Sequence, residues 1–363
     1  MPKSPPEYVG FGMLTPVEIM VLEKLPKHNT GAIVTEVNEF VFDDAAIVAC
    51  LLRQWDVSAG MIGTAVGDDE RGHSLAKRLK DWGVQGKVRF TKEYKTPLEV
   101  NVSDRKGART YFWQRTPQIL QTLDSANLSL IRGSKVLYVD WYDGSHVLRA
   151  MDQANRHKVP VFVNLEHGHK YPDVLKKYAD RAMFCQAVTD AAQLGGKWAL
   201  IGTARKLLKS GIETAIITLA KGGCLVAQGN EIVRVFAPQV KAVDACGAGA
   251  TFSAGYIYSY LKGWDIEQSA RFATAAATLK VTRAGLQMSS VTEILELADR
   301  LKVEHWAFKN NRFEILDRIM NIPRQMAAQS KRAQARLMRE LRLPKRNATR
   351  NEQTQVKTKR KTV

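Results

Sequence analysis

The sequence predicts an α/β protein with a doubly wound, mostly parallel sheet, a small β lid and a basic C-terminal tail. From about residue 135, short apolar segments typical of buried strands alternate with helical segments. Strands separated by helices pair in parallel and are covered on both faces. Residues 95–112 alternate in polarity and predict two lid strands. The last 43 residues carry most of the excess positive charge.

The first 115 residues predict a mixture of lid strands and core elements. Asp43–Gln54 reads as a helix, with Asp43 or Asp44 as its N-cap. Gly83 is expected to end a second, amphipathic helix. Asp104–Gly107 is expected to form the turn between the two lid strands. The remaining expected elements are a strand at 7–14, a strand at 57–62, a helix at 71–82 and lid strands within about 10–40 and 95–115.

The second half predicts the core of the sheet. Gln228–Asn230 should form the turn of a hairpin over 225–235. The other expected strands are 135–139, 159–164 and 215–219, and the expected helices are 145–156, 249–262 and 266–282. Ligands of such sheets bind beyond the C-terminal ends of the strands, so the site is expected there.

Composition limits the class of protein. The chain has 363 residues, of which 45% are hydrophobic, enough for one large domain and an appendage. Its start is polar and Pro-rich, unlike a signal peptide, and no apolar run is long enough to span a membrane. Four scattered cysteines without C-x-x-C spacing favour a reducing compartment. We therefore expect a cytoplasmic protein.

The basic tail is the second predicted domain. We place the boundary between 1–305 and 306–363, with a helix to about residue 343 and disorder beyond it. Residues 321–363 carry 13 basic and 2 acidic side chains, which supply 11 of the net charge of +18. A solvated charge run, contact with RNA or DNA through phosphates, and contact with an acidic protein or an anionic membrane surface are the three interpretations.

The most informative segment is V-D-A-C-G-A-G-A-T-F-S-A-G at 243–255. Small residues from Cys246 to Gly249 lie where a loop enters a predicted helix. They let the backbone approach a ligand closely, and the exposed N–H groups with the positive end of the helix dipole favour an anion. The segment therefore predicts an anion site.

This segment resembles the signature D-x-x-G-A-G-D-x-F-x-x-G of the PfkB, or ribokinase-type, carbohydrate kinases. Other segments resemble the family in the same order: G-T-A-V-G-D-D-E-R-G at 63–72, Thr96-Pro97 with G-A-R-T at 107–110, T-L-A-K-G-G at 218–223 and T-R-A-G at 282–285. The resemblance implies a ribokinase-like fold and phosphoryl transfer from ATP, with Mg²⁺, to a hydroxyl of a sugar or sugar-like substrate. It also implies a homodimer, because lid strands in this family often pair between subunits.

The resemblance implies a role for particular residues. Those expected to form the anion hole are Cys246, Gly247, Ala248 and Gly249, and Asp244 is expected to hold a monovalent cation. The nucleotide is expected to contact Thr218, Lys221 and Gly223. The substrate is expected to contact Asp43, Asp44 and Arg109.

The departures from the family fall on its chemistry. Ala250 stands where the family has the Asp that accepts the proton of the attacking hydroxyl. The sugar-binding G-G-x-x-x-N positions become Phe42, Asp43 and Ile47, and an early sugar-binding Asp falls near Thr15. The magnesium-organising N-x-x-E becomes Gln186-Ala187-Val188-Thr189, and the Gly of T-L-G becomes Ala220.

Three explanations fit Ala250. It can be an engineered knockout, a natural loss, or a loss rescued by a carboxylate relocated to Asp43 or Asp44. The first functional hypothesis is thus a carbohydrate kinase impaired by Ala250. The alternative is a pseudokinase, a scaffold or ligand sensor whose basic tail binds nucleic acid or a large complex.

Three further features have two interpretations each. Glu166-His167-Gly168-His169 resembles a metal cluster but lacks H-E-x-x-H spacing and a partner Cys, which favours a polar loop and no metal. Cys246 stands at a helix start that could activate its thiol, or it merely fills the turn. Trp141 and Tyr142 follow a strand and either line the pocket or pack.

Overall fold

A nine-stranded sheet forms the centre of the computed structural model, which describes residues 4–104, 109–189, 196–283, 285, 287 and 289–308. The strand order is β15-β14-β13-β12-β11-β10-β9-β1-β4. Pairing is parallel from β4 to β12 and antiparallel from β12 to β15. The strands are β1 Tyr8–Gly12, β4 Ala59–Gly63, β9 Val136–Asp140, β10 Val161–Glu166, β11 Phe184–Val188, β12 Thr214–Thr218, β13 Cys224–Gln228, β14 Glu231–Val235 and β15 Val303–Ala307. The predicted α/β class and the hairpin over 225–235 are confirmed.

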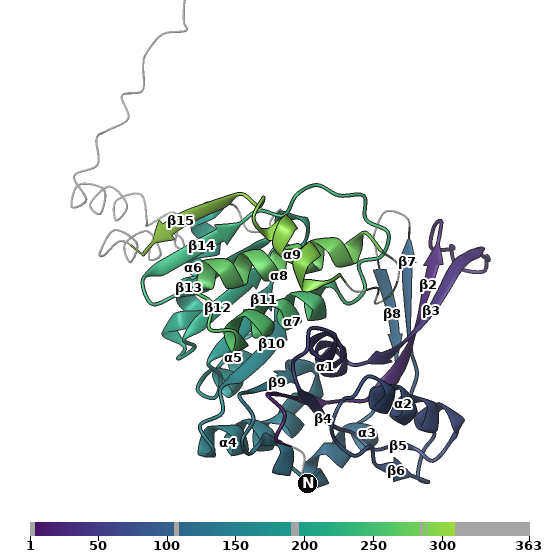
Figure 1. The fold of residues 1–363 in the computed structure, drawn as a ribbon. Helices are drawn as coiled ribbons and strands as arrows, with labels where there is room; N and C mark the ends of the chain where they lie inside the picture. Colours follow the sequence, from purple (N-terminus) through teal and green to yellow (C-terminus); the bar gives the residue numbers. More distant parts are fainter. Residues whose placement is uncertain are drawn as a thin grey trace, which may run out of the picture. The chain divides into compact units, whose positions relative to one another are not determined.

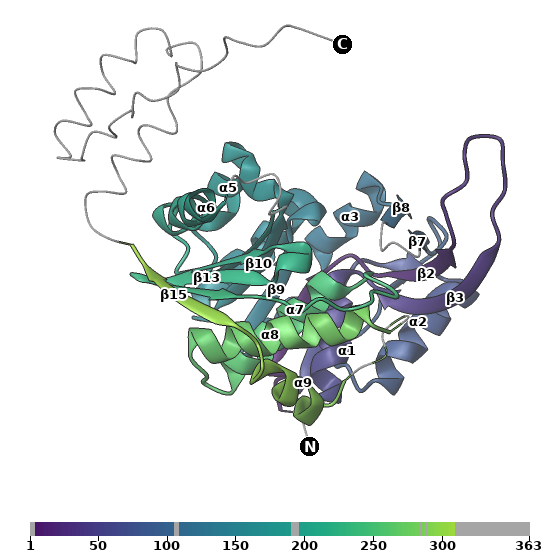
Figure 2. The same ribbon diagram turned by 90° about the horizontal axis from the view of Figure 1, so that it is seen from above.

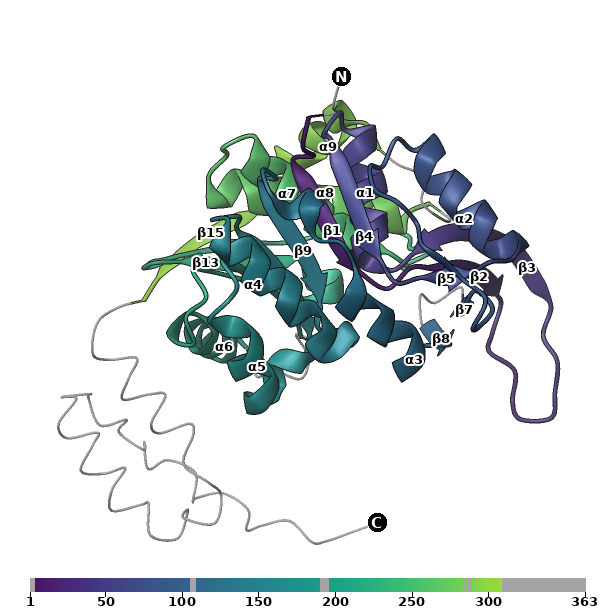
Figure 3. The same ribbon diagram turned by 90° about the horizontal axis from the view of Figure 1, so that it is seen from below.

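Two groups of helices cover the sheet (Figure 1, Figure 2, Figure 3). On one face, α1 packs on α7, α7 on α8 and α8 on α9, whose bounds are Asp44–Gln54, Ala248–Leu261, Ile266–Val281 and Val291–Ala298. The other face carries α4 Leu148–Arg156, α5 Pro172–Ala179 and α6 Lys197–Lys209. Among the described residues, no helix is both long enough and apolar enough to cross a membrane.

Side-chain caps explain where the helices begin. The carboxylate of Asp43 accepts a hydrogen bond from the backbone N–H of Asp44, so the predicted cap of α1 is confirmed at Asp43. Asp69 caps α2, Glu70–Asp81, and Asp265 forms a capping box with Gln268 at the start of α8. α7 differs, because Gly247 precedes it in the left-handed region (φ 72°) without any side-chain cap.

A second sheet, in the order β3-β2-β7-β8, forms the lid. Its strands are β2 Thr15–Leu22, β3 Val34–Phe42, β7 Glu99–Asp104 and β8 Arg109–Trp113. Glu99, Asn101 and Ser103 alternate along β7 and are all buried, so they share one face of the strand. The short strands β5 Val66–Gly67 and β6 Phe90–Thr91 pair separately, and α3 Pro117–Gln121 follows β8.

The structure differs from the expected domain boundary at residue 305. Trp306 and Ala307 belong to β15 and pair with Ile232 and Glu231 of β14. The unit that contains the sheet therefore runs to Phe308. The sequence pattern hid this strand because β15 is an edge strand with only partly buried side chains. The expected tail helix, the disordered end and the nucleic-acid contact fall outside the described residues, as does most of the turn at 104–107.

The loop after β12 carries unusual backbone geometry. Ala220 has φ 47° although it has a side chain, and Gly223 has φ 90°. A Cβ at Gly223 would lie 2.3 Å from the carbonyl O of Val235, whereas Ala220 is exposed. The buried guanidinium of Arg234 donates to the carbonyl O of Gly222 and of Cys224 at 2.7 and 2.9 Å, which ties this loop to β14. Left-handed backbone costs an L-residue roughly 1–2 kcal/mol, so Ala220 is strained.

The two positions should respond oppositely to substitution. We expect Ala220→Gly to change the free energy of unfolding by less than about 1 kcal/mol, in the stabilising direction, because glycine adopts this φ without strain. We expect Gly223→Ala to lower it by more than about 2 kcal/mol, because its Cβ has no room. Urea unfolding of both variants measures this difference. An equal loss in the two variants would contradict it.

Candidate functional site

The N-terminus of α7 forms the centre of the candidate site. Its first turn has no side-chain cap, and Gly247, Ala248 and Gly249 are only half-buried. Uncapped N–H groups at the positive end of a 14-residue helix can bind an anion. The N–H of Cys246 differs from this group, because it donates to Asp244 Oδ1 at 2.8 Å. The N–H of Ala248 is engaged as well, because it donates to the carbonyl O of Ala245 at 3.3 Å. Among residues 246–249, the described geometry therefore suits Gly247 and Gly249 best for an anion.

Ala250 lies in the same first turn and is 1% exposed. Its methyl group belongs to the hydrophobic core cluster, together with Cys246 and Phe252. A methyl group accepts no proton, so this position provides no general base. The thiol of Cys246 is buried too and lies 3.7 Å from the hydroxyl of Ser103.

The carboxylate of Asp244 is completely buried and surrounded by donors. Lys280 Nζ lies 2.8 Å from Oδ2 and 3.0 Å from the carbonyl O of the same residue. The N–H of Gly285 donates to Oδ2 at 3.0 Å, and the hydroxyl of Ser103 lies 3.4 Å from Oδ1. The expected monovalent cation does not fit this carboxylate, because a side-chain ammonium already contacts it.

The Mg²⁺ position also differs from what the family implies. Gln186 is fully buried, and its amide donates to the carbonyl O of Gly249 at 3.4 Å and accepts from the hydroxyl of Ser253 at 2.8 Å. Thr189 is buried as well. Neither residue offers the carboxylate oxygen that Mg²⁺ prefers, and the amide of Gln186 is engaged with α7. These residues do not fit a magnesium site.

A row of polar side chains crosses three neighbouring strands near this point. Asp140, Asn164 and Gln186 are paired in register on β9, β10 and β11. Asn164 Nδ2 lies 3.4 Å from Asp44 Oδ2, and Tyr138 donates to Asp140 Oδ1 at 3.3 Å. Within the described residues, Asp140 Oδ2 is buried without a hydrogen-bond partner. Burial, and then the charge of Asp44, raise the pKa of Asp140 well above its usual range.

A second cluster joins the start of α1 to the lid. Arg115 forms ion pairs with Asp43 and Asp143, and Asp143 Oδ2 also accepts from the N–H of Met13 at 2.9 Å. Burial raises the pKa of Asp143 to about 6, while Arg115 opposes the shift. Asp43 is thus both a helix cap and half of an ion pair, which leaves it poorly placed to be a relocated base.

The lid strand β7 contributes polar groups to the same region. Burial and the charge of Asp43 raise the pKa of Glu99 to about 7, while Arg115 and Asn101 oppose the shift. Asn101 is completely buried, and its amide atoms make no hydrogen bond of standard geometry within the described residues, although the amide lies close enough to Glu99 to lower the pKa of that carboxyl group. The amide of Asn101 is thus near Glu99 and, like Asp140 Oδ2, keeps hydrogen-bonding capacity for a ligand.

The residues expected near the nucleotide lie on the loop after β12. Thr218 ends β12 and donates to the carbonyl O of Ala187 at 3.3 Å, Lys221 is exposed, and Gly223 ends the turn Ala220–Gly222. Thr218 pairs in register with Val188 at the end of β11. The structure describes the backbone of Arg109 at the start of β8 but not its side chain.

The structure also describes the Glu166–His169 segment and the aromatic pair Trp141 and Tyr142. His169 is buried, its Nδ1 lies 2.5 Å from the carbonyl O of Glu166, and burial lowers its pKa. Tyr142 is exposed and donates to Glu166 at 2.5 Å, whereas Trp141 is half-buried. The part of the chain that is described contains no group of three His, Cys, Asp or Glu side chains that could hold a metal ion.

Sequence reasoning missed six residues of the site: Glu99, Asn101, Arg115, Asp140, Asp143 and Asn164. A signal existed for Asp140 and Asn164, because each lies at the C-terminal end of a predicted buried strand, where parallel sheets bind ligands. The lid residues alternate on a predicted strand and could have been assigned to its inner face. Arg115 and Asp143 carry no local pattern.

The chain is 23% identical over 259 residues to an ATP-dependent 6-phosphofructokinase of Thermoanaerobacterium thermosaccharolyticum, covering 67% of this chain and 80% of that protein. It is 26% identical over 242 residues to a deoxyribokinase of Salmonella typhi, covering 62% and 76%.

Solved structures share the fold. A structure of Arabidopsis thaliana ribokinase complexed with ribose and ATP has a TM-score of 0.64 and 18% identity, over 82% of this chain and 99% of that one. A ribokinase from Thermotoga maritima has a TM-score of 0.65 and 18% identity, over 81% and 99%. The sequence model described as pfkB family carbohydrate kinase matches residues 34–293. The expected ribokinase-like fold is thus confirmed, and the chain belongs to the pfkB family of carbohydrate kinases.

Proposed function

We propose that this protein binds ATP and a sugar-like acceptor at the N-terminus of α7 but transfers the phosphoryl group slowly. The observation that carries this proposal is Ala250, a buried methyl group in the turn where the family has its base. The uncapped helix start beside it supports the binding of an anion. Substrate binding and proton removal are therefore separated in this chain.

The half-buried backbone N–H groups of Gly247 and Gly249 would stabilise the charge of the transferred group. In the transfer, the acceptor oxygen forms a bond to the γ-phosphorus while the bond to the bridging oxygen breaks, and its electron pair leaves on ADP. Because position 250 offers no carboxylate, the proton of the acceptor hydroxyl must pass to water or to the phosphate. A positioned base contributes about 10²–10⁴-fold in rate, which is the loss we expect here.

The polar groups under the lid favour an acceptor rich in hydroxyls. The amide of Asn101 can both donate and accept, and Asp140 Oδ2 can accept or, when protonated, donate. Hydroxyl groups satisfy both kinds of partner. The relatives are named as kinases of sugars and sugar phosphates, which supports a hydroxyl-rich acceptor but does not select one compound.

The alternative is a pseudokinase, and one observation favours it. Gln186 uses its amide on Gly249 and Ser253, so the site keeps its packing while lacking the magnesium-binding carboxylates of the family. In that case the protein would sense a ligand or act as a scaffold. The charge of residues 321–363 would then attract RNA, DNA or an acidic partner.

We also infer a homodimer through the lid. The edge strand β8 exposes Tyr111, Phe112 and Trp113, and the opposite edge strand β3 exposes Val34 and Val37. Apolar edge strands pair readily with another chain.

We expect Trp113→Lys to shift the sedimentation coefficient from that of a dimer to that of a monomer. If the unsubstituted protein and the Trp113→Lys variant both sediment as monomers, the inferred homodimer is wrong.

Replacing Ala250 tests the proposed function. We expect Ala250→Asp to raise ATP-dependent phosphorylation by about 10²–10⁴-fold on at least one acceptor, because it restores a base. Ribose, deoxyribose, fructose, fructose 6-phosphate and a nucleoside form the panel. Ala250→Asn is the matched control, since it has the same size but accepts no proton, and we expect it to equal the unsubstituted protein.

ATP binding by the unsubstituted protein, measured by calorimetry, completes this test. Binding of ATP without transfer in any variant would favour the pseudokinase. Absence of both binding and transfer in folded variants would contradict the kinase proposal. Because Ala250 is buried, circular dichroism of each variant must accompany the assay.

Glu99 predicts a pH-dependent stability. The pKa of the Glu99 carboxyl is raised to about 7 in the folded protein, whereas it is about 4.5 in the unfolded chain. Between these two pH values the unfolded chain has lost the proton and the folded protein still holds it, so the free energy of unfolding falls as the pH rises from about 4.5 to 7. We expect Glu99→Gln to raise the free energy of unfolding by roughly 1–3 kcal/mol at pH 8 and by much less at pH 4. Urea unfolding at the two pH values measures this difference. Equal effects at both would exclude a raised pKa.

A further inference from the structure

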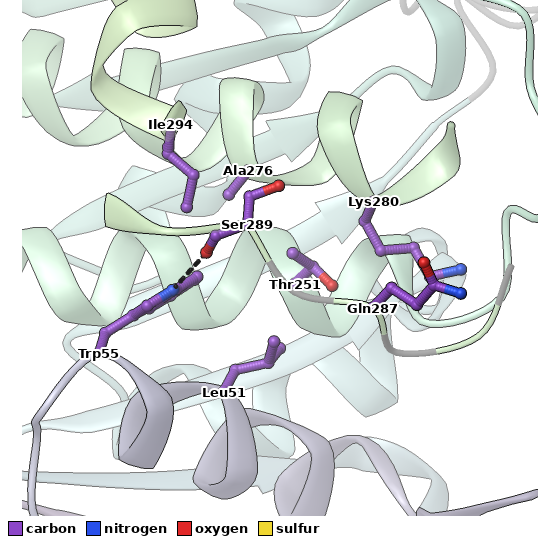
Figure 4. Close-up of a pocket in the computed structure, with 8 residues that line it drawn as sticks. All are labelled: Leu51, Trp55, Thr251, Ala276, Lys280, Gln287, Ser289 and Ile294. Atoms are coloured by element: carbon purple, nitrogen blue, oxygen red, sulfur yellow. Dashed lines mark hydrogen bonds between the residues drawn. The ribbon is translucent and has the colours of Figure 1, made fainter. Parts of the chain in front are cut away.

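Lys280 lies where the family resemblance places a monovalent cation. It occupies the last turn of α8 and is only 4% exposed. Figure 4 shows its side chain beside Gln287 at one end of a small cavity, which α1, α7, α8 and α9 surround and which Trp55 closes at the other end. A lysine buried this deeply needs a partner, because burial penalises an unpaired charge.

That partner is the carboxylate of Asp244. The Nζ of Lys280 contacts two oxygens of this residue, one from the side chain at 2.8 Å and one from the backbone at 3.0 Å. A monovalent cation would use the same kinds of oxygen at this position. An ammonium group is similar in size and equal in charge to a potassium ion.

The coordination of Asp244 leaves little room for an additional ion. A carboxylate offers about four acceptor positions. Oδ2 accepts from Lys280 and from the N–H of Gly285, and Oδ1 accepts from the N–H of Cys246 and lies near the hydroxyl of Ser103. These four donors match the capacity of the group, so an external cation would have to displace one of them.

We propose that the ammonium of Lys280 takes the place of a monovalent cation at Asp244 and positions the N-terminus of α7 without one. The donors around Asp244 come from β7, from the loop before α7, from α8 and from the segment after α8. Their common centre fixes the start of α7 against the lid. Lys280 is thus a positioning residue, whose role does not depend on the kinase reaction.

Thermal unfolding in different salts tests the proposal without an activity assay. The unsubstituted protein is heated in potassium, sodium, lithium and choline chloride at one ionic strength. We expect its Tm to agree within about 2 °C in all four salts, because the cation is built in. A Tm that is higher in potassium than in choline by more than this range would show that an external ion binds, and would overturn the proposal.

Removing the ammonium should create the missing site. We expect Lys280→Ala to lower Tm by roughly 5–15 °C in choline chloride, since it leaves a buried carboxylate unpaired. Potassium or ammonium ions should restore a large part of this loss with a saturable dependence on concentration. Lys302→Ala is the matched control, because the ammonium of Lys302 is exposed, pairs with Glu304 and lies 4.9 Å from the centre of the Phe236 ring, away from Asp244.

The variant decides between two roles of Lys280. If folded Lys280→Ala responds equally to potassium and choline, Asp244 is not a cation position and Lys280 is only its ion-pair partner, which overturns the proposal. If the variant does not fold, the salt comparison on the unsubstituted protein remains the deciding measurement.

Discussion

The buried carboxylate of Asp244 is the constraint on which the site depends. It joins the lid strand, the loop before α7, the end of α8 and the segment after it through Ser103, Cys246, Lys280 and Gly285. These segments are far apart in the sequence, and the negative charge would be very costly to bury without them. The position of the uncapped helix start follows from these contacts.

Around that centre the chain has the fold of its family, while several positions at which the resemblance implies site residues carry other side chains. Gly247 is left-handed before α7, and Ala220 holds φ 47° where the family has glycine. Ala250 is packed in the core, and the amide of Gln186 forms hydrogen bonds with Gly249 and Ser253 in the first turns of α7. A single engineered substitution would have altered Ala250 alone. On the function proposed above, the joint departures at these positions favour a natural loss of the base over an engineered one.

The fold could be predicted from local patterns, and the charged contacts could not. Asp43 as a cap, the hairpin around Gln228–Asn230 and the helix after Gly247 each have a signal within a few residues. The pairs of Arg115 with Asp43 and Asp143 join residues far apart in the sequence. Because only the topology brings them together, no spacing in the sequence reveals them. The edge strand β15 lacked the buried alternation by which strands are recognised.

The exchange of a bound ion for Lys280 has a physical consequence for the site. An external cation can leave, so it links the geometry of its site to the salt around the protein. A tethered ammonium remains at all salt concentrations, and the helix α8 determines where it lies. The site thereby loses a means of regulation and gains a fixed arrangement of the α7 N-terminus. Such an arrangement suits binding of an anion as well as catalysis, which is why the position of Lys280 is compatible with both functions proposed above.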